Sequence, residues 1–164
     1  MTPNEKPQPV TIERVYPATI EELWALWTTK EGFEAWWGPV GFRVEVHELR
    51  AEVGGPLIYD MIAAAPEQIA AMQAMGQPIS HGTRGIFAEV VPQERLVLRH
   101  VIDFLPGVAP YDNDIEVTFH QEGDRARMVV TIQPHFSAEF TKMAVAGFES
   151  QLEKLPEVLV RRRG

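Results

Sequence analysis

Apolar and polar residues alternate, or recur with helical spacing, along the first part of the chain. Residues 10–16 alternate, which predicts a strand. Residues 19–22 have the form of a capping box, in which a threonine hydroxyl and a glutamate carboxylate three residues later satisfy each other's backbone amides. Apolar residues then recur every three or four positions. We therefore expect a helix that Gly32 ends and a second, shorter helix at residues 33–37.

Period-two alternation dominates the middle of the chain and predicts six further strands. They cover residues 42–47, 57–62, 83–91, 96–104, 115–120 and 128–132. Turn residues separate them, among them Gly54 and Gly55 inside the first hairpin. Residues 66–75 interrupt the series and are expected to form an inserted helix, because they have a proline at the start and Gly76 behind the last residue.

The C-terminal segment is expected to form one long amphipathic helix, with Ser137 as its N-cap. The residues that share its apolar face are Phe140, Ala144, Phe148, Gln151, Leu152, Leu155 and Leu159. Pro156 is expected to kink the final turns, because its ring displaces the backbone hydrogen bond to the residue four positions earlier. The small residues Ala144 and Gly147 would leave space beneath the helix.

This order of elements predicts an α+β fold of the helix-grip kind. An antiparallel sheet has one face to bury, and only the C-terminal helix is long enough to cover it. We therefore expect a curved antiparallel sheet around a long C-terminal helix, with two short helices after the first strand. Residues 10–164 would form a single ligand-binding domain behind a flexible tail at residues 1–9. The curvature of the sheet would leave an apolar pocket beside the helix.

Composition narrows the classes of function. The chain has 164 residues, of which 45% are hydrophobic and 23% charged, as in ordinary globular domains. A net charge of −8 argues against a nucleic-acid partner, because such a partner requires a basic face. The basic run at residues 161–163 is read as charge that favours the end of a helix. No apolar run is long enough to span a membrane and the polar N-terminus is not a signal peptide, so a cytoplasmic protein is expected.

Several motifs resemble those of one protein family. They lie at residues 36–39 (Trp-Trp-Gly-Pro), 54–59 and 85–96, and at Gly147, Phe148, Gln151, Leu152 and Leu155. From about Val10 to Leu159 the chain resembles the START-like (SRPBCC) superfamily, to which polyketide cyclases and the birch-pollen allergen are related. Within it, the chain resembles homologues of the activator of the 90-kDa heat-shock-protein ATPase. The resemblance implies the helix-grip fold but no particular reaction. The insert at residues 66–75, and His100 where an aromatic residue is often found, depart from the family pattern.

Neither a metal site nor a catalytic nucleophile is expected. The five histidines, at positions 47, 81, 100, 120 and 135, lack the spacing of metal ligands. Strand alternation points His47, His120 and His135 toward solvent. The sequence has no cysteine, no G-x-S-x-G motif and no serine with an evident base partner. It therefore predicts no catalytic residue, no metal and no cofactor.

His100 is the residue most open to interpretation. It lies on the apolar face of its strand between Leu98 and Ile102, so it is expected to face the interior. It could be a core histidine bonded to a backbone carbonyl or to Tyr59, a polar group aimed at a ligand, or a general acid or base. All three interpretations stay open on the sequence.

The tryptophans, methionines and inserted helix each have two interpretations. Trp36 or Trp37 could pack the short helices against the sheet or form a wall of the pocket. Five methionines could fill the core or converge on the pocket, namely Met61, Met72, Met75, Met128 and Met143. The inserted helix could be a lid over the pocket or the interface of a homodimer.

The predicted function is the binding of a small apolar or aromatic molecule. The expected ligand-binding residues are Trp36, Leu57, Tyr59, Met61, Leu98, His100, Val117, Phe119, Met143 and Ala144. The first alternative is a cyclase- or hydrolase-like enzyme that uses His100 with Tyr59 or an ordered water. The second is a regulator of the chaperone ATPase, as the family name implies, although that co-chaperone carries an additional domain that this chain is expected to lack.

Overall fold

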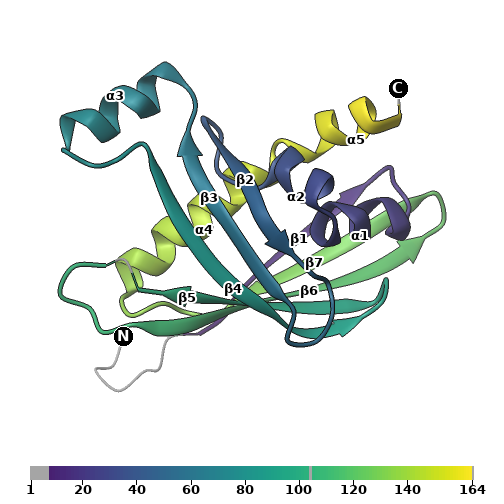
Figure 1. Cartoon of the computed structure of the whole chain (residues 1–164). Coiled ribbons are helices and arrows are strands. Elements are labelled where there is room, and N and C mark those ends of the chain that lie inside the picture. The colour runs from purple at the N-terminus through teal and green to yellow at the C-terminus, as the bar shows by residue number, and fades with distance from the viewer. Residues whose placement is uncertain (1–7, 104, 164) are drawn as a thin grey trace.

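Seven antiparallel strands form one sheet that curves around the C-terminal helix in a computed structural model (Figure 1). The structure describes residues 8–103 and 105–163, so most of the predicted tail at residues 1–9 lies outside the described residues. The strands are β1 (Val10–Tyr16), β2 (Phe42–Leu49), β3 (Pro56–Ala63), β4 (Ser80–Val91), β5 (Arg95–Ile102), β6 (Tyr111–Glu122) and β7 (Arg125–Ile132). Their order in the sheet is β1-β7-β6-β5-β4-β3-β2, which confirms the predicted α+β, helix-grip architecture.

The strand predictions differ from the structure mainly at strand ends. β6 begins at Tyr111, four residues before the predicted start, and pairs with β5 along its added length. The run Asp112, Asn113 and Asp114 hides this start, because polar residues on both faces erase the period-two pattern. β5 ends at Ile102, and Phe104, which was expected to continue its inner face, lies outside the described residues.

The two short helices form a compact unit on one end of the concave face. Helix α1 (Ile20–Thr28) has the predicted capping box: the Glu22 amide donates to Thr19 Oγ1 and the Thr19 amide donates to Glu22 Oε1, each at 3.0 Å. The prediction that Gly32 ends this helix is wrong, because Gly32 lies inside α2 (Lys30–Trp36). Thr29 separates the helices, and its hydroxyl accepts from the Gly32 amide at 3.0 Å. A side chain at Gly32 would collide with α1, since its Cβ would lie 2.1 Å from the Ala25 carbonyl oxygen.

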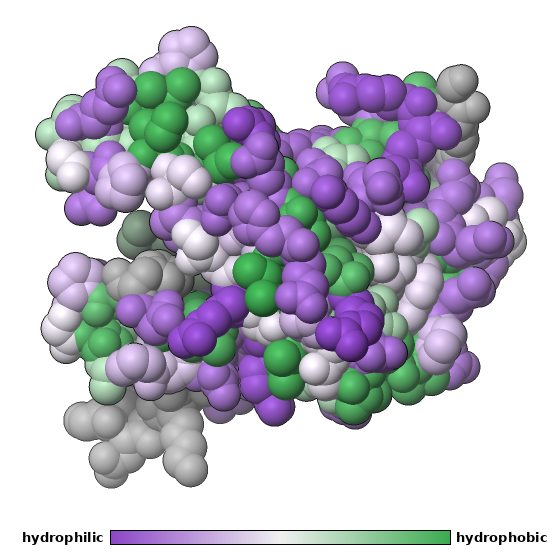
Figure 2. Space-filling model, in the orientation of Figure 1, coloured by the Kyte–Doolittle hydropathy of each residue, from purple (hydrophilic) through white to green (hydrophobic). Residues whose placement is uncertain are grey.

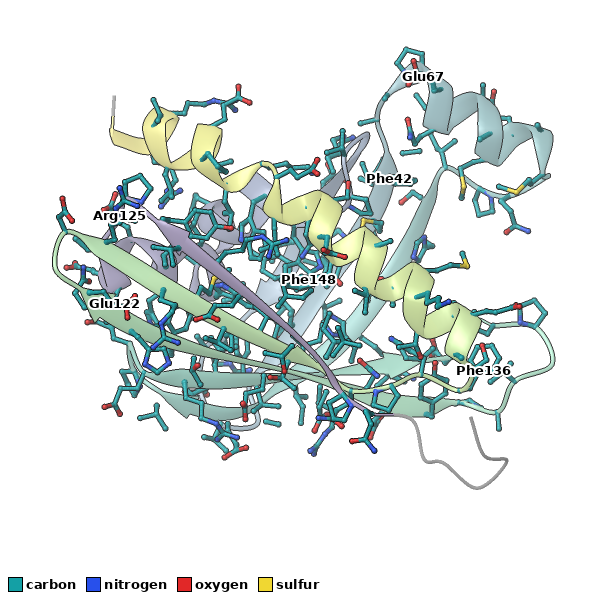
Figure 3. The ribbon with its side chains drawn as sticks, turned by 180° about the vertical axis from the view of Figure 1, so that it is seen from behind. Phe42, Glu67, Glu122, Arg125, Phe136 and Phe148 are labelled. Carbon is teal, nitrogen blue, oxygen red and sulfur yellow. The ribbon has the colours of Figure 1, made fainter. Side chains whose placement is uncertain are left out.

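Aromatic side chains fill the space between these helices, the sheet and the second half of the C-terminal helix. Trp27 and Trp36 are fully buried, and each ring N–H has a partner. Trp27 Nε1 lies 3.3 Å from Met128 Sδ, and Trp36 Nε1 donates to the Leu26 carbonyl oxygen at 2.8 Å. Phe148 points from the C-terminal helix toward the sheet (Figure 3) and contacts both indoles. This end of the concave face is therefore a solid core.

The predicted single C-terminal helix is two segments, α4 (Ala138–Leu152) and α5 (Leu155–Arg163). Pro156 is the reason, since its missing N–H cannot bond the carbonyl of Leu152. The chain closes a tight turn instead, and Lys154 Nζ donates to the Phe42 carbonyl oxygen at 3.2 Å, which ties the junction to β2. The predicted kink is thus confirmed, as is the Ser137 N-cap, whose hydroxyl accepts from the Phe140 amide.

The inserted helix is present as α3 (Pro66–Ala74) and has no buried residue. Figure 2 shows apolar side chains on α3 and a recess that separates this helix from the body of the protein below it. The Gln68 side chain of α3 lies against Gly41. Ile69 and Met72 of the same helix are half-buried. None of the helices among the described residues has both the length and the hydrophobicity needed to cross a membrane.

Replacing Gly32 with alanine should lower the free energy of unfolding by about 2 kcal/mol, because the new methyl group would overlap the Ala25 carbonyl oxygen. Gly147→Ala is the matched control. In α4 the new Cβ would meet only Pro39 Cγ at 3.6 Å, and alanine favours a helix over glycine by about 0.8 kcal/mol. Urea unfolding followed by circular dichroism measures both changes. Equal effects at the two positions would contradict the close approach of α1 and α2.

Candidate functional site

Two adjoining hollows lie on the concave face, at the end of the sheet that the short helices leave uncovered. The inner hollow, of about 190 Å³, is lined by Trp37, Tyr59, Met61, His81, Thr83, His100, Ile102, Asn113, Ile115 and His135. The outer hollow, of about 380 Å³, is lined by Pro39, Phe42, Met61, His81, Phe140, Met143 and Ala144. Met61 and His81 form a wall of both, so the two hollows adjoin beneath the first half of α4.

A chain of three hydrogen-bonded rings forms the floor of the inner hollow. Trp37 Nε1 donates to the Tyr59 hydroxyl at 3.0 Å, and that hydroxyl lies 3.0 Å from His100 Nε2. The planes of Trp37 and His100 are nearly parallel, at 11°, with ring centroids 6.1 Å apart. His100 therefore faces the interior as predicted, and of its three interpretations the bond to Tyr59 is present.

Burial keeps this pair uncharged. Desolvation lowers the pKa of His100 to about 4, and the neighbouring His135 adds to the effect. Desolvation also raises the pKa of Tyr59, although hydrogen bonds from Trp37 and Thr83 oppose it. At neutral pH the histidine is thus a weak base and the tyrosine a weak acid. Such a pair is suited to hydrogen bonding rather than to proton transfer.

Four polar residues of the inner hollow were not predicted: His135, Asn113, His81 and Thr83. His135 was expected in solvent, which is wrong: it is half-buried and its Nδ1 lies 2.7 Å from the Tyr111 hydroxyl. Strand alternation did not apply to it, because β7 ends at Ile132. Asn113 is buried and donates from Nδ2 to the Gln133 carbonyl oxygen at 2.9 Å. Asn113 lies two positions before Ile115 on β6, so strand alternation could have predicted that it faces the interior.

His81 is the third of these residues, and it faces Met61 across the β3–β4 ladder. It is half-buried, and desolvation lowers its pKa while the charge of Asp60 opposes the shift. Asp60 itself lies on the other side of β3, where its Oδ2 is 2.9 Å from Nε2 of the exposed His47. The exposure of His47 and of His120 agrees with strand alternation.

The ten predicted ligand-binding residues divide into two groups. Those that line a hollow are Tyr59, Met61, His100, Met143 and Ala144. Those that line neither hollow are Trp36, Leu57, Leu98, Val117 and Phe119, all of which are buried in the core. Phe119, for example, is covered by Trp24 of α1, with ring centroids 5.5 Å apart. Strand parity selects the face of the sheet but not which part of that face a helix covers.

Of the five methionines, only Met61 and Met143 share a hollow, the outer one. Met128 is fully buried beside Trp27, whereas Met75 is exposed and Met143 stands at the rim of the outer hollow with 69% of its surface exposed. Met72 lines a separate recess of about 220 Å³ between α3 and His81. Among the described residues no group of histidines and carboxylates is arranged to hold a metal ion.

The family model of the Activator of Hsp90 ATPase homolog 1-like proteins matches residues 17–160, a stretch that includes every residue of both hollows. The chain belongs to this family. None of the curated proteins matches it.

Solved structures of several proteins share the fold. The AHSA1 protein from Silicibacter pomeroyi has a TM-score of 0.74 at 18% identity, over 94% of this chain and 99% of that one. A protein from Chromobacterium violaceum has a TM-score of 0.72 at 23% identity, over 92% and 95%. The AHSA1-like protein from Aeromonas hydrophila has a TM-score of 0.71 at 17% identity, over 94% of each chain. At these identities the likeness concerns the fold alone.

Acid should destabilise the protein through His100. A histidine of the unfolded chain takes up a proton near pH 6.5, whereas folded His100 does so only near pH 4. The unfolded state therefore binds more protons in this window, and stability present above pH 6.5 is lost as the pH falls toward 4, by up to about 3 kcal/mol. Urea unfolding between pH 7.5 and 4.5 measures the slope.

The variant His100→Phe should show a shallower loss of stability than the parent protein, because the phenyl ring cannot bind a proton. His120→Asn, which removes an exposed histidine, is the control and should keep the parent slope. A parent slope in His100→Phe would contradict the assignment.

Proposed function

We propose that the protein binds a small apolar or aromatic molecule in the inner and outer hollows. The observation that carries the proposal is their shared wall, Met61 and His81, beneath α4. Ligand pockets usually measure about 300–1,000 Å³ and combine an apolar lining with a few placed polar groups. The inner hollow is smaller than this range by itself, but together with the outer hollow it falls within it.

The lining supports an apolar ligand. Phe42, Phe140 and Ala144 offer carbon surface in the outer hollow, and burial of apolar surface contributes about 25 cal/mol per Å² before the costs of association. Met61 and Met143 are flexible and polarisable, so they can adapt to ligands of different shape. The indole of Trp37, held by its bond to Tyr59, is a rigid part of the wall of the inner hollow.

The arrangement favours binding over catalysis. An acid–base enzyme needs a group whose pKa lies near the working pH, and the shifts of His100 and Tyr59 take both away from neutrality. The second alternative, a role toward a chaperone ATPase, has only the family's name in its favour.

Filling the outer hollow should weaken binding. Ala144→Trp places an indole in the space beneath α4, whereas Ala146→Trp puts the same side chain on the exposed face of that helix. N-phenyl-1-naphthylamine, an uncharged probe that fluoresces in apolar surroundings, should bind to the parent protein and to Ala146→Trp. Its affinity for Ala144→Trp should fall at least about tenfold, equivalent to 1.4 kcal/mol.

Fluorescence titration of the probe gives the three dissociation constants, and circular dichroism establishes that both variants are folded. Absence of probe binding to the parent protein, or equal affinities for all three proteins, would contradict the proposal that the hollows bind a ligand.

A further inference from the structure

The polar groups of the site are confined to one of its two hollows. Besides Trp37, whose ring N–H is bonded to Tyr59, six polar side chains line the inner hollow: Tyr59, His81, Thr83, His100, Asn113 and His135. The outer hollow is apolar except for His81 at the shared wall. A molecule that occupies both hollows therefore meets a polar end and an apolar end.

The inner hollow holds no formal charge at neutral pH. Its lining contains no aspartate, glutamate, lysine or arginine. Burial lowers the pKa of His81, His100 and His135, so all three rings are neutral. Burial and then His135 lower the pKa of His100, and no carboxylate among the described residues contributes to that shift. Asp60, which acts on His81, is engaged by His47 on the opposite side of β3.

The free ring nitrogens suit a head group that both donates and accepts. Tyr59 occupies Nε2 of His100 and Tyr111 occupies Nδ1 of His135. The second nitrogen of each ring forms no hydrogen bond with another described residue. A neutral imidazole carries one donor and one acceptor nitrogen, so its tautomer can follow the partner. An alcohol, phenol or amide matches such groups, whereas a buried ion would lack a counter-charge.

From these observations we infer that the ligand is an uncharged amphiphile, with an alcohol, phenol or amide head in the inner hollow and an apolar body in the outer hollow. This inference rests on the proposed function and adds the chemical class of the ligand. It explains why a pocket with so much carbon surface carries six polar side chains at one end.

A series of eight-carbon ligands tests the inference. Octan-1-ol, 1-chlorooctane, octanoate and octylammonium compete with bound N-phenyl-1-naphthylamine at pH 8, each below its micelle-forming concentration. Octan-1-ol should displace the probe at a concentration at least about tenfold lower than either ion, because neither ion finds a counter-charge. It should also bind at least as tightly as 1-chlorooctane, which a hollow without hydrogen-bonding groups would favour.

A charged side chain in the wall between the two hollows should change the order of the ligand affinities. Met61→Lys keeps a long unbranched side chain but brings an ammonium group to the boundary of the two hollows, so octanoate should then bind more tightly than octan-1-ol. Met75→Lys is the matched control. Because that side chain is 64% exposed and lines neither hollow, water screens its charge and the parent order of affinities should remain. If circular dichroism shows that Met61→Lys does not fold, His81→Lys replaces it at the same wall.

The outcomes separate the inference from the proposed function. Octanoate or octylammonium binding as tightly as octan-1-ol, tighter binding of 1-chlorooctane, or an unchanged order in the folded wall variant would overturn the inference. Failure of all four ligands to displace a bound probe would also overturn it, while the site itself stands. Failure of the probe to bind the parent protein would remove both.

Discussion

The position of one indole ring decides where the protein is solid and where it is hollow. Trp37 stacks on Phe33, with ring centroids 4.5 Å apart, and lies nearly parallel to His100, with ring centroids 6.1 Å apart. Its ring N–H is bonded to the Tyr59 hydroxyl, so the ring cannot turn away without leaving a buried donor unpaired. Trp37 packs in the core cluster with Phe33 and Phe148, and it also lines the inner hollow together with His100. Everything proposed for the site depends on this boundary.

The boundary is itself set by how closely the two short helices approach. Gly32 lets α2 pack against α1, and the Thr29 hydroxyl caps α2 at the point where the chain turns. At the other end of α2, the Gly38 amide donates to Oε1 of the buried Gln151, which joins this segment to α4. Gln151 thus holds the backbone of this turn, and Tyr59 holds the side chain of Trp37 in the same turn. A wall fixed in this way is preorganised, which reduces the ordering that binding would cost.

The chemistry of the hollows follows from burial rather than from charge. The Tyr59 hydroxyl is hydrogen-bonded to one ring nitrogen of His100, and desolvation keeps both side chains neutral. A site built from neutral donors and acceptors can select a ligand by hydrogen bonding and shape, but it offers little to an ion. The chain shares its fold with solved structures at low sequence identity. Its function must therefore be inferred from these side chains and not from the fold.

Local sequence patterns were enough to predict the elements and the faces that they bury. Alternation places the seven strands and turns His100 inward, the capping box marks the start of α1, and Pro156 marks the break before α5. These signals are local, because each arises from neighbouring residues on one element. Three features came from the packing of the whole chain instead. They are the part of the inner face that is covered, the choice of Trp37 rather than Trp36 as a lining residue, and the position of His81 and His135 beside His100. Those choices depend on contacts between residues far apart in the chain, which periodicity along one strand cannot express.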